Sequence, residues 1–492
     1  MPFQQGAQQL VCYQRLPTSQ HMIAFIVALS FILGIVSAVH AILETRTPQG
    51  AIAWVVCLLV FPIVSVPAYW VLGRSRFHGY VNAWQEASDA IRKPLDEALE
   101  EFKPLQVQAP ESMPEYAAIT RLANFQFVTG NHTELLIDGQ NTFESIEAGI
   151  EAATDYVLFQ FYILRLDGVG NRFKEQLIRK AREGVKVLVL YDELGSSSLA
   201  KENAASLVAP NISVRPFNTR QGRRNRFQLN FRNHRKIVVV DGRVAWLGGL
   251  NVGDDYLGLD PKLSPWRDTH MRIEGPAAVT AQAIFVSDWY WAAREFLDFL
   301  SWRPYPTEAA GKPALVLGSG PADELETASL FFTTVLNLAR ERIWIATPYF
   351  IPDEATMVAL RLALLRGTEV RILTPRLNDN WFVRQAANVY LSELADMGAR
   401  IFFYEKGFMH QKVVLIDSAA AIIGTVNFDN RSFRLNFEVS GAVADSEFAN
   451  QVETMLEQDF GNSTEASDYR LRDQPFLDRL QARTAALLAP VL

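Results

Sequence analysis

Cysteine is nearly missing from this chain of 492 residues, since only Cys12 and Cys57 occur and both lie close to the N-terminus. The long remainder therefore cannot be a disulfide scaffold and is compatible with a reducing compartment. A basic excess is also missing, because the formal net charge is −7. Phosphate affinity requires clustered positive charge, so this balance argues against a nucleic-acid partner. The length predicts two sizeable cores and an accessory segment.

Charged residues are absent from two runs near the N-terminus, Met22 to Val39 and Ala51 to Gly73. Each run is long enough to cross a hydrocarbon core as a helix. The alternatives are a signal peptide for the first run and a buried core helix for the second. A polar stretch, rather than the short basic region of a signal peptide, precedes the first run. We predict a membrane hairpin over residues 1–80, with spans at about 22–43 and 51–73.

The connection "ETRTPQG" between the two runs is short, so both ends of the predicted hairpin should lie on one side of the membrane. Arg15, Arg74 and Arg76 lie on that side, against Arg46 alone in the turn. The positive-inside rule then places the bulk of the protein in the cytoplasm.

After the hairpin, residues 81–130 are typical of a charged, amphipathic helical linker. Two stretches, 155–190 and 342–375, then show the same order of apolar strand, amphipathic helix and apolar strand. This order predicts βαβ units with parallel strands buried on both faces. A segment with prolines and a glycine, 301–313, separates two halves that we place at 131–300 and 314–492. The tail from Phe476 fits an amphipathic helix that either packs on the core or contacts the membrane.

One motif occurs once in each half. The stretch "NHRKIVVVDGRVAWLGGLN" contains His234, Lys236 and Asp241, followed by Gly248 and Asn251. The stretch "HQKVVLIDSAAAIIGTVN" repeats the same residue types at the same offsets, with His410, Lys412, Asp417, Gly424 and Asn427. A single His-x-Lys at a strand end would most often be solvated surface. The chain has only seven histidines, so two copies of the motif at the same offsets are very unlikely to arise by chance. They indicate a duplication with a function.

Displacement at a phosphodiester explains why two copies are useful. Such a reaction needs a nucleophile on one side of phosphorus and a proton donor for the leaving alkoxide on the other, and imidazole can fill either role. Two lysines can stabilise the charge that develops on the phosphate oxygens, a task otherwise given to metal ions. Neither copy carries a carboxylate cluster suited to Mg²⁺. The sequence therefore implies no metal and no cofactor.

The duplicated pattern H-x-K-x4-D-x6-G, with the asparagine that follows, resembles the phospholipase D superfamily. Together with the hairpin, the stretches "YDELGS", "WRDTHMRIEGP", "TPYFIPDE" and "GTVNFDNRSFRLNFE" are similar to bacterial cardiolipin synthases. The resemblance implies an α/β fold in which two phospholipase D-like repeats pack about a pseudo-twofold axis, preceded by an α-helical transmembrane hairpin. It also implies a multi-pass protein of the bacterial inner membrane.

Carried over by this resemblance, His234 is the nucleophile that forms a covalent phosphatidyl-histidine and His410 transfers protons, although the two roles could be exchanged. Lys236 and Lys412 would hold phosphate oxygens, with hydrogen bonds from Asn251 and Asn427. A carboxylate should orient each imidazole. The resemblance gives Glu438 this part for the histidine of the other repeat, and Asp268 is the candidate in the first half if "LGLDPKLSP" is an insertion.

Three further residues have predicted roles. Asp241 and Asp417 belong to the catalytic motif, but they lie at the far ends of apolar strands, so we expect them to hold turns rather than touch phosphate. Arg232 belongs to an arginine-rich stretch, 220–236, that is either a solvated loop or a surface for anionic lipid. Its guanidinium could also bind a second phosphate.

The resemblance implies phosphatidyl transfer from one phosphatidylglycerol to another, which gives cardiolipin and glycerol. The expected partners are this anionic phospholipid and the membrane, and the sequence leaves the oligomeric state open. Hydrolysis to phosphatidic acid is the first alternative, and transfer to another acceptor lipid is the second. A membrane-bound nuclease and an inactive lipid-binding scaffold are less compatible with the acidic balance and with two intact motifs.

Overall fold

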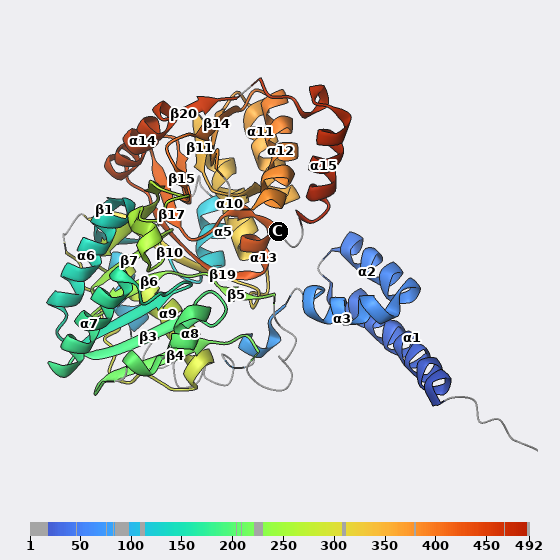
Figure 1. Cartoon of the computed structure of the whole chain (residues 1–492). Coiled ribbons are helices and arrows are strands. Elements are labelled where there is room, and N and C mark those ends of the chain that lie inside the picture. The colour runs from blue at the N-terminus through green and yellow to red at the C-terminus, as the bar shows by residue number, and fades with distance from the viewer. Residues whose placement is uncertain are drawn as a thin grey trace, which may run out of the picture. The chain divides into compact units, whose positions relative to one another are not determined.

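The computed structural model describes residues 18–45, 47–74, 76–81, 83, 98–108, 114–202, 204–207, 209–220, 230–307, 311–377, 380–466 and 468–489. The described residues divide into two compact units, one that ends at Arg74 and one that begins at Arg76. Figure 1 shows the elements of both units.

Three apolar helices form the N-terminal unit: α1 (Thr18–Glu44), α2 (Pro48–Val60) and α3 (Pro62–Leu72). Thr47 caps α2, because its hydroxyl accepts a hydrogen bond from the Gly50 amide at 3.3 Å. Gly34 lets α2 approach α1 closely, since a Cβ at this position would lie 2.5 Å from the Leu58 carbonyl oxygen. The indole of Trp70 donates to the hydroxyl of Ser37 at 3.1 Å, so α3 also packs on α1.

The predicted second span over 51–73 is not one continuous helix. It is interrupted at Phe61, whose φ of −129° and ψ of 56° are not helical. Pro62 explains the interruption, because it has no amide hydrogen and restricts the residue before it. At 1.5 Å per residue α1 is about 40 Å long, whereas α2 and α3 are about 20 Å and 16 Å. Among the described residues, only His21–Glu44 of α1 is long and apolar enough to cross a bilayer by itself.

The second unit contains one order of elements twice. The first repeat consists of β1 (Val128–Ile137), α6 (Asp138–Ala152), β2 (Tyr156–Phe161), α7 (Gly168–Arg182), β3 (Lys186–Asp192), α8 (Ser197–Glu202), β4 (Ile212–Phe217), β5 (Arg232–Asn233), β6 (Ile237–Val240), β7 (Val244–Gly248), β8 (Trp266–Arg267), β9 (Thr269–Glu274) and α9 (Ala277–Ala293). Short 3-10 turns lie at Ala204–Leu207 and Asp254–Leu257.

The second repeat consists of β10 (Lys312–Ser319), α10 (Thr327–Leu338), β11 (Arg342–Ala346), β12 (Phe350–Ile351), α11 (Glu354–Leu365), β13 (Glu369–Pro375), α12 (Trp381–Asp396), β14 (Arg400–Tyr404), β15 (Phe408–Met409), β16 (Val413–Ile416), β17 (Ala420–Gly424), β18 (Phe428–Asp429), α13 (Asn430–Arg434), β19 (Asn436–Val443) and α14 (Ser446–Gly461). The chain then continues through β20 (Ser463–Glu465), a 3-10 turn at Leu471–Asp473 and α15 (Phe476–Ala486).

The strands form a 16-stranded sheet in the order β20-β14-β13-β11-β16-β17-β19-β10-β1-β9-β7-β6-β2-β3-β4, with β5 beside β19. From the β10–β1 junction outward, the strands of the two repeats follow one another in equivalent order, except that β20 has no counterpart. Two repeats related by a twofold axis require this order. The strands β2, β3 and β4 are parallel, as are β11, β13 and β14. The predicted α/β fold with two repeats and two βαβ units is confirmed.

The two repeats share one core. A single buried cluster contains Leu247 and Met271 from the first repeat and Ala421 and Phe437 from the second. Gly441 in β19 is needed for this approach, because a Cβ there would lie 2.6 Å from the sulfur of Met271. The repeats are therefore fixed against one another by apolar burial, which gives the site between them a rigid frame.

The segment before the first repeat is not only a linker. The helix α5 (Pro114–Ala123) places Ile119 and Ala123 in a buried cluster with Phe331 of α10. Upstream, the Tyr80 hydroxyl donates to an oxygen of Asp288 at 2.9 Å, so the chain joins the second unit before residue 81. Residues 82 and 84–97 of the predicted linker lie outside the described residues.

Candidate active site

Both His-x-Lys segments lie at the edge of the sheet where the parallel strands end. Gln160 near the end of β2 pairs with Ile237, and Ala346 at the end of β11 pairs with Val413. The predicted strands thus begin one residue after each lysine, and the lysines turn back toward their histidines. Lys236 Nζ donates to the carbonyl oxygen of His234 at 2.7 Å, and Lys412 Nζ donates to that of His410.

The residue between each histidine and lysine points away from them. The guanidinium of Arg235 binds Asp288 of α9 at 2.7 Å, and the amide of Gln411 donates to Asp459 of α14 at 2.8 Å. Both pairs are buried. Each His-x-Lys segment is therefore held by a carboxylate from the helix that closes its own repeat.

Short parallel pairings bring each histidine against the opposite repeat. β5 of the first repeat pairs with β19, and β15 of the second repeat pairs with β8. The amide of His234 donates to the Phe437 carbonyl oxygen at 2.9 Å, and that of His410 donates to the Arg267 carbonyl oxygen at 2.8 Å. The next residues along those partner strands are Glu438 and Asp268.

These two carboxylates hold the imidazoles. Nδ1 of His234 lies 2.9 Å from Oε2 of Glu438, and Nδ1 of His410 lies 3.0 Å from Oδ2 of Asp268. Both carboxylates are fully buried. A carboxylate at Nδ1 fixes the tautomer that has its hydrogen there, which leaves Nε2 of each ring as the nitrogen for chemistry.

Strand register shows that the two carboxylates are equivalent. Gly248 of the first motif pairs with His270, and Gly424 of the second pairs with Ser440. Asp268 and Glu438 each lie two residues before that partner. The extra residues between Asn251 and Asp268 therefore form an insertion that leaves the geometry of the site unchanged.

The surroundings of the two carboxylates differ. The Thr425 hydroxyl donates to Glu438 at 2.5 Å, and the amide of Asn436 donates to it at 3.1 Å. In the first repeat the equivalent of Thr425 is Gly249, where a Cβ would lie 2.0 Å from Oδ1 of Asp268. Asp268 instead accepts a hydrogen bond from the Thr269 amide at 2.8 Å.

Burial keeps both imidazoles neutral at neutral pH. It lowers the pKa of His234 to about 4, with Glu438 opposing and Lys236 adding to the shift. Burial and Lys412 lower the pKa of His410 to about 3. Burial also lowers the pKa of Lys236 to about 7. For Glu438, burial raises the pKa, but the attraction of His234 and Lys236 outweighs it and holds the pKa below its ordinary value.

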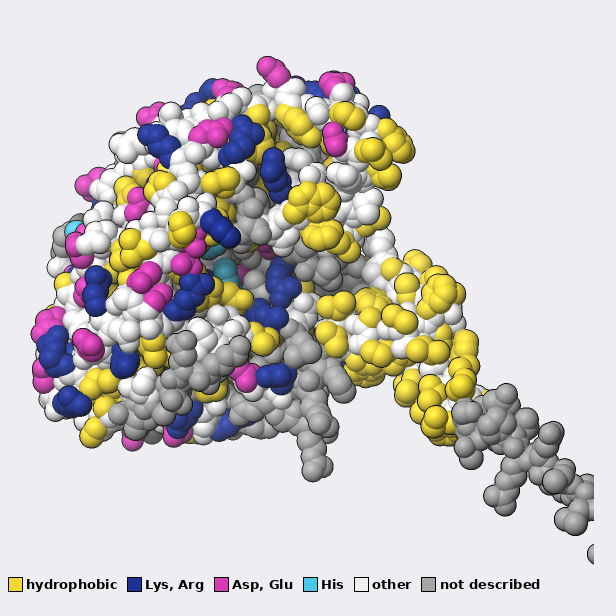
Figure 2. Space-filling view, in the orientation of Figure 1, with side chains coloured by type: hydrophobic (Ala, Val, Ile, Leu, Met, Phe, Trp, Pro, Cys, Tyr) yellow, Lys and Arg dark blue, Asp and Glu magenta, His cyan; other side chains and the backbone are white. Residues whose placement is uncertain are grey.

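Both histidines line one cavity of about 680 Å³ between the repeats. Figure 2 shows a hollow on this face with histidine at its floor and Lys or Arg side chains around it. The predicted residues Arg232, Asn251 and Asn427 also line the cavity. Asn251 is already engaged, since its oxygen accepts from the Ile163 amide at 3.0 Å and its nitrogen donates to the Tyr256 hydroxyl at 2.8 Å.

The motif aspartates lie away from this cavity and hold turns. Asp241 accepts hydrogen bonds from the amides of Thr154, Asp155 and Tyr156 at 2.8 to 2.9 Å. Asp417 does the same for the amides of residues 340–342. Both have a positive φ, 52° and 51°, at the turn that follows the strand. The geometry agrees with a structural part for these two aspartates and gives them no contact with a substrate in the cavity.

Sequence reasoning missed several residues around the histidines. Arg431 lines the cavity and donates to the Asn230 carbonyl oxygen at 2.7 Å. The rings of Tyr162 and His234 lie 5.0 Å apart, and those of Trp266 and His410 lie 5.3 Å apart. Tyr162 follows β2 directly, so its place just beyond the end of a parallel strand was a signal that could have identified it.

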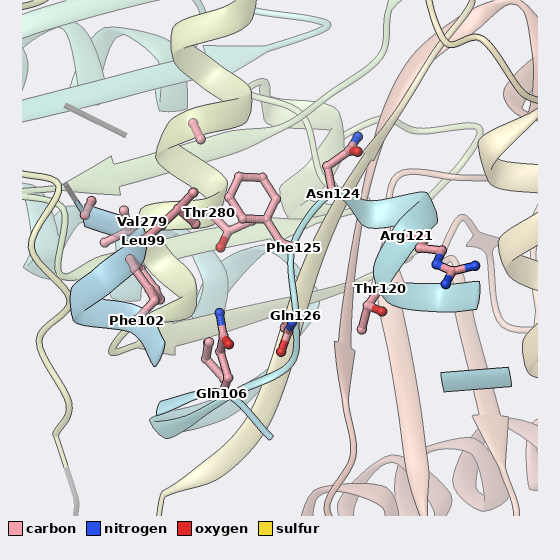
Figure 3. A pocket seen from close by; sticks show the side chains of 13 residues that line it. Leu99, Phe102, Gln106, Thr120, Arg121, Asn124, Phe125, Gln126, Val279 and Thr280 are labelled. Carbon is pink, nitrogen blue, oxygen red and sulfur yellow. The ribbon is translucent and has the colours of Figure 1, made fainter. Parts of the chain in front are cut away.

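A second cavity, of about 380 Å³, lies elsewhere in the same unit. Helical residues 98–102, α5 and α9 surround it, and Figure 3 shows Leu99 and Phe102 on one side and Arg121 on the other. Arg121 is the one charged side chain among the described residues that line this cavity. Without a nucleophile or an acid-base pair, this cavity does not compete with the histidine site for the chemistry.

Comparison with known proteins identifies relatives over nearly the whole chain. A family model described as "Cardiolipin synthase, PLD-like domain" matches residues 146–283 and 332–460, and one described as "Phospholipase_D-nuclease N-terminal" matches residues 32–74. The cardiolipin synthase A of Pseudomonas fluorescens is 44% identical over 96% of this chain and 99% of its own length. That of Pseudomonas putida is 44% identical over the same shares.

A solved structure shows the same fold at low identity. The phosphatidylserine synthase of Haemophilus influenzae is 16% identical, covers 77% of this chain and 100% of its own chain, and superposes with a TM-score of 0.57.

Proposed function

Since the chain belongs to the cardiolipin synthase family of the phospholipase D superfamily, we propose that it transfers a phosphatidyl group from one phosphatidylglycerol to a second, which gives cardiolipin and glycerol. One observation carries the mechanism: two neutral imidazoles line a single cavity, and each has Nδ1 held by a carboxylate of the opposite repeat. This arrangement supplies a nucleophile and a proton carrier at one phosphate.

In the first step Nε2 of His234 attacks phosphorus and the bond to the glycerol oxygen breaks. His410 gives its proton to that oxygen, glycerol leaves, and the phosphatidyl group is bonded to His234. In the second step a hydroxyl of another phosphatidylglycerol gives its proton to His410 and attacks phosphorus, and the bond to His234 breaks. We assign His234 as the nucleophile because the N-terminal histidine commonly has that part in the superfamily.

The negative charge of the substrate prepares His410 as an acid. Burial and the nearby lysines by themselves lower the pKa of His410 to about 3. A phosphodiester anion between the two lysines offsets their charge, which favours a proton on His410. Lys236 and Lys412 then stabilise the oxygens as phosphorus becomes five-coordinate. Asn251 and Asn427 position the substrate from the wall of the cavity, and Glu438 and Asp268 stabilise the imidazolium forms.

The acceptor carries a phosphate of its own, and two arginines support a place for it. Arg232 from the first repeat and Arg431 from the second both line the cavity. Burial and the charge of Arg232 lower the pKa of Arg431, so the two guanidinium groups are close enough to repel one another. A second phosphate between them removes this repulsion, since a guanidinium binds phosphate through paired hydrogen bonds.

We also propose that the protein is a multi-pass protein of the bacterial inner membrane with its catalytic unit in the cytoplasm. The apolar helices α1 to α3 and the positions of Arg74 and Arg76 after α3 support this orientation. Arg15 and Arg46, the other two arginines in the charge comparison across the membrane, lie outside the described residues. A cysteine introduced at Glu175 should react with a membrane-impermeant maleimide in inverted vesicles but not in intact ones.

The function is tested with purified full-length protein in vesicles of phosphatidylglycerol alone, with a chelator present. Mass spectrometry should find cardiolipin and glycerol in equal amounts, and His234→Ala should produce neither. His132→Ala, at an exposed histidine in β1, is the matched control and should retain full activity. Phosphatidic acid without cardiolipin would make the protein a hydrolase. Turnover that begins only after phosphatidylethanolamine is added would contradict the proposed pair of substrates.

A further inference from the structure

The helix α15 has its small residues inside and its large apolar residues outside. It packs on α12 with Ala482 and Ala485 buried, and Ala485 together with Ala489, just beyond the helix, shares a buried cluster with Val383 and Ala386 of α12. A helix that only closes a soluble core places its large apolar side chains against that core. The opposite arrangement leaves a strip of apolar surface that stays exposed among the residues that the structure describes.

This strip continues onto the start of α12. The six side chains that compose it are each between 50% and 80% exposed, and they are Trp381, Phe382, Phe476, Leu477, Leu480 and Leu487. We call them the α12–α15 surface. Figure 2 shows hydrophobic side chains gathered where Figure 1 places α12 and α15. So many large exposed apolar side chains in one place indicate an interaction site.

The surface lies next to the opening of the catalytic cavity. Asn380 and Val383 line that cavity, and Trp381 and Phe382 stand between them in the chain. Val383 is also in the cluster that holds α15, so one residue connects the cavity wall to the support of the surface. A lipid with its phosphate at the histidines must direct its acyl chains out of the cavity.

Charge at the border indicates which kind of apolar partner fits. Three exposed arginines flank the apolar strip, Arg384 on α12 and Arg479 and Arg483 on α15, against one exposed acidic side chain in α15, Asp478. Arg483 is three residues from Leu480 and four from Leu487, so it lies on the same face of the helix. Apolar side chains bordered by cations match a layer of acyl chains beneath anionic headgroups.

We propose that the α12–α15 surface docks the catalytic unit on an anionic lipid bilayer, with Trp381, Phe382, Leu480 and Leu487 inserted at the boundary of headgroups and acyl chains. The opening of the cavity then faces the lipids that it must receive. The inference rests on the proposed function, because that function requires lipid to enter the cavity. The docking itself can be measured without turnover.

The test uses the full chain in vesicles of phosphatidylglycerol, with Cys12 and Cys57 replaced by serine. An environment-sensitive fluorophore is attached at Leu480→Cys, and lipids with a spin label near the headgroup are added as quenchers. Insertion to the depth of an interfacial helix predicts quenching by about twofold or more. The matched control is the fluorophore at Leu365→Cys, an equally apolar exposed position. Because α11 runs back from the catalytic edge of the sheet, Leu365 lies at the opposite edge and should show no quenching.

A second measurement separates docking from catalysis. The double variant Trp381→Ser, Phe382→Ser should lower kcat/KM for phosphatidylglycerol in vesicles by about tenfold, as expected for the loss of two inserted aromatic side chains. Its activity on a short-chain phosphatidylglycerol dissolved as monomers should be unchanged. Equal quenching at positions 480 and 365, or an equal loss on both substrates, would overturn the proposal. If the full chain made no cardiolipin from either substrate, the proposed function would fail while the quenching result would still decide the docking.

Discussion

The two repeats place the same chemistry at the same strand positions but build it from different residues. In the second repeat Glu438 reaches His234 with support from the hydroxyl of Thr425. In the first repeat the shorter Asp268 reaches His410, and Gly249 replaces the threonine because a Cβ there would lie 2.0 Å from the carboxylate. Glu438 with Thr425, and Asp268 with Gly249, thus meet the same geometric requirement, which is a carboxylate at Nδ1 of the histidine.

The crossing of the repeats teaches a second point. Each histidine takes its carboxylate from the other half of the chain, through the β5–β19 and β15–β8 pairings. Neither repeat therefore contains a complete imidazole-carboxylate pair by itself. Because each half supplies the carboxylate for the histidine of the other, the reaction depends on the interface between the repeats. The two histidines can then take different roles.

The largest expected effect separates those roles. His234→Ala and His410→Ala should each lower kcat by about 10⁴-fold or more, as removal of a nucleophile or its proton partner does elsewhere. A phosphatidyl ester of p-nitrophenol distinguishes them, because this leaving group needs no proton. His410→Ala should release a burst of nitrophenol equal to the enzyme present, and His234→Ala should not. A burst from His234→Ala alone would exchange the two assignments.

Neutralising the carboxylates should have the next largest effect. Glu438→Gln and Asp268→Asn keep the shape but remove the charge that stabilises the imidazolium, so kcat should fall by about 10²- to 10⁴-fold in each. Circular dichroism and melting temperature should change little for both variants. If one variant lost less than about tenfold, the two carboxylates would not be functionally equivalent.

A smaller effect tests the different support of the two carboxylates. Gly249→Ala should displace Asp268 and lower kcat by about 10- to 100-fold, whereas Thr425→Ala removes one hydrogen bond to Glu438 and should cost about tenfold. The control is Gly461→Ala, since a Cβ there meets no atom within 4 Å. Full activity in Gly249→Ala would show that Asp268 does not need its present position.

The pH dependence should be flat where an ordinary histidine titrates. The nucleophile must be neutral, and burial lowers the pKa of His234 to about 4. His410 must carry a proton in the first step, so its titration is removed by following the nitrophenol burst of His410→Ala. Between pH 6.5 and 5 the second-order rate constant of this burst should change by less than about twofold, since the ordinary histidine pKa of about 6.5 does not apply to His234. The unfolded chain binds protons in this range that the folded chain does not, so the free energy of unfolding should decrease as pH falls from 6.5 toward 4. A loss of this rate constant of about fivefold between pH 6.5 and 5.5, as an ordinary histidine would give, would contradict the burial argument.

The smallest effect on catalysis should come from the motif aspartates. Asp241→Asn and Asp417→Asn each weaken several hydrogen bonds at a turn, and the free energy of unfolding should drop by about 1–3 kcal/mol. The activity of the folded fraction should stay within about twofold, measured as kcat per folded molecule from calorimetry and rate assays at one temperature. A loss of kcat of about 10²-fold in a stable variant would give these residues a direct part in the reaction.

Much of the catalytic unit could be predicted because its signals are local or repeated. β2 is apolar apart from Gln160, the centre of β3 is an apolar run, and the helix between them shows amphipathic spacing. The duplicated motif identified His234, Lys236, His410 and Lys412, and the resemblance to the superfamily gave Glu438. Asp268 required a guess about an insertion, which strand register now explains.

The remaining features depend on contacts between distant segments. Nothing local shows that β5 pairs with β19, so the place of Arg431 beside Arg232 could not be read from spacing. The break at Phe61 had a visible signal in Pro62, but apolar composition outweighed it in the prediction of one long span. For the tail helix α15 the sequence left core packing and membrane contact open, and only packing on α12 shows which side chains are buried.

The stereochemical course at phosphorus tests the central claim most directly, because a covalent intermediate on one histidine requires two in-line displacements. A phosphatidylglycerol analogue with one non-bridging oxygen replaced by sulfur is chiral at phosphorus, and its configuration can be compared with that of the cardiolipin formed. The account predicts net retention, since each displacement inverts the configuration once. Net inversion would mean that the acceptor attacks the first lipid directly, and it would contradict the separate roles given to His234 and His410.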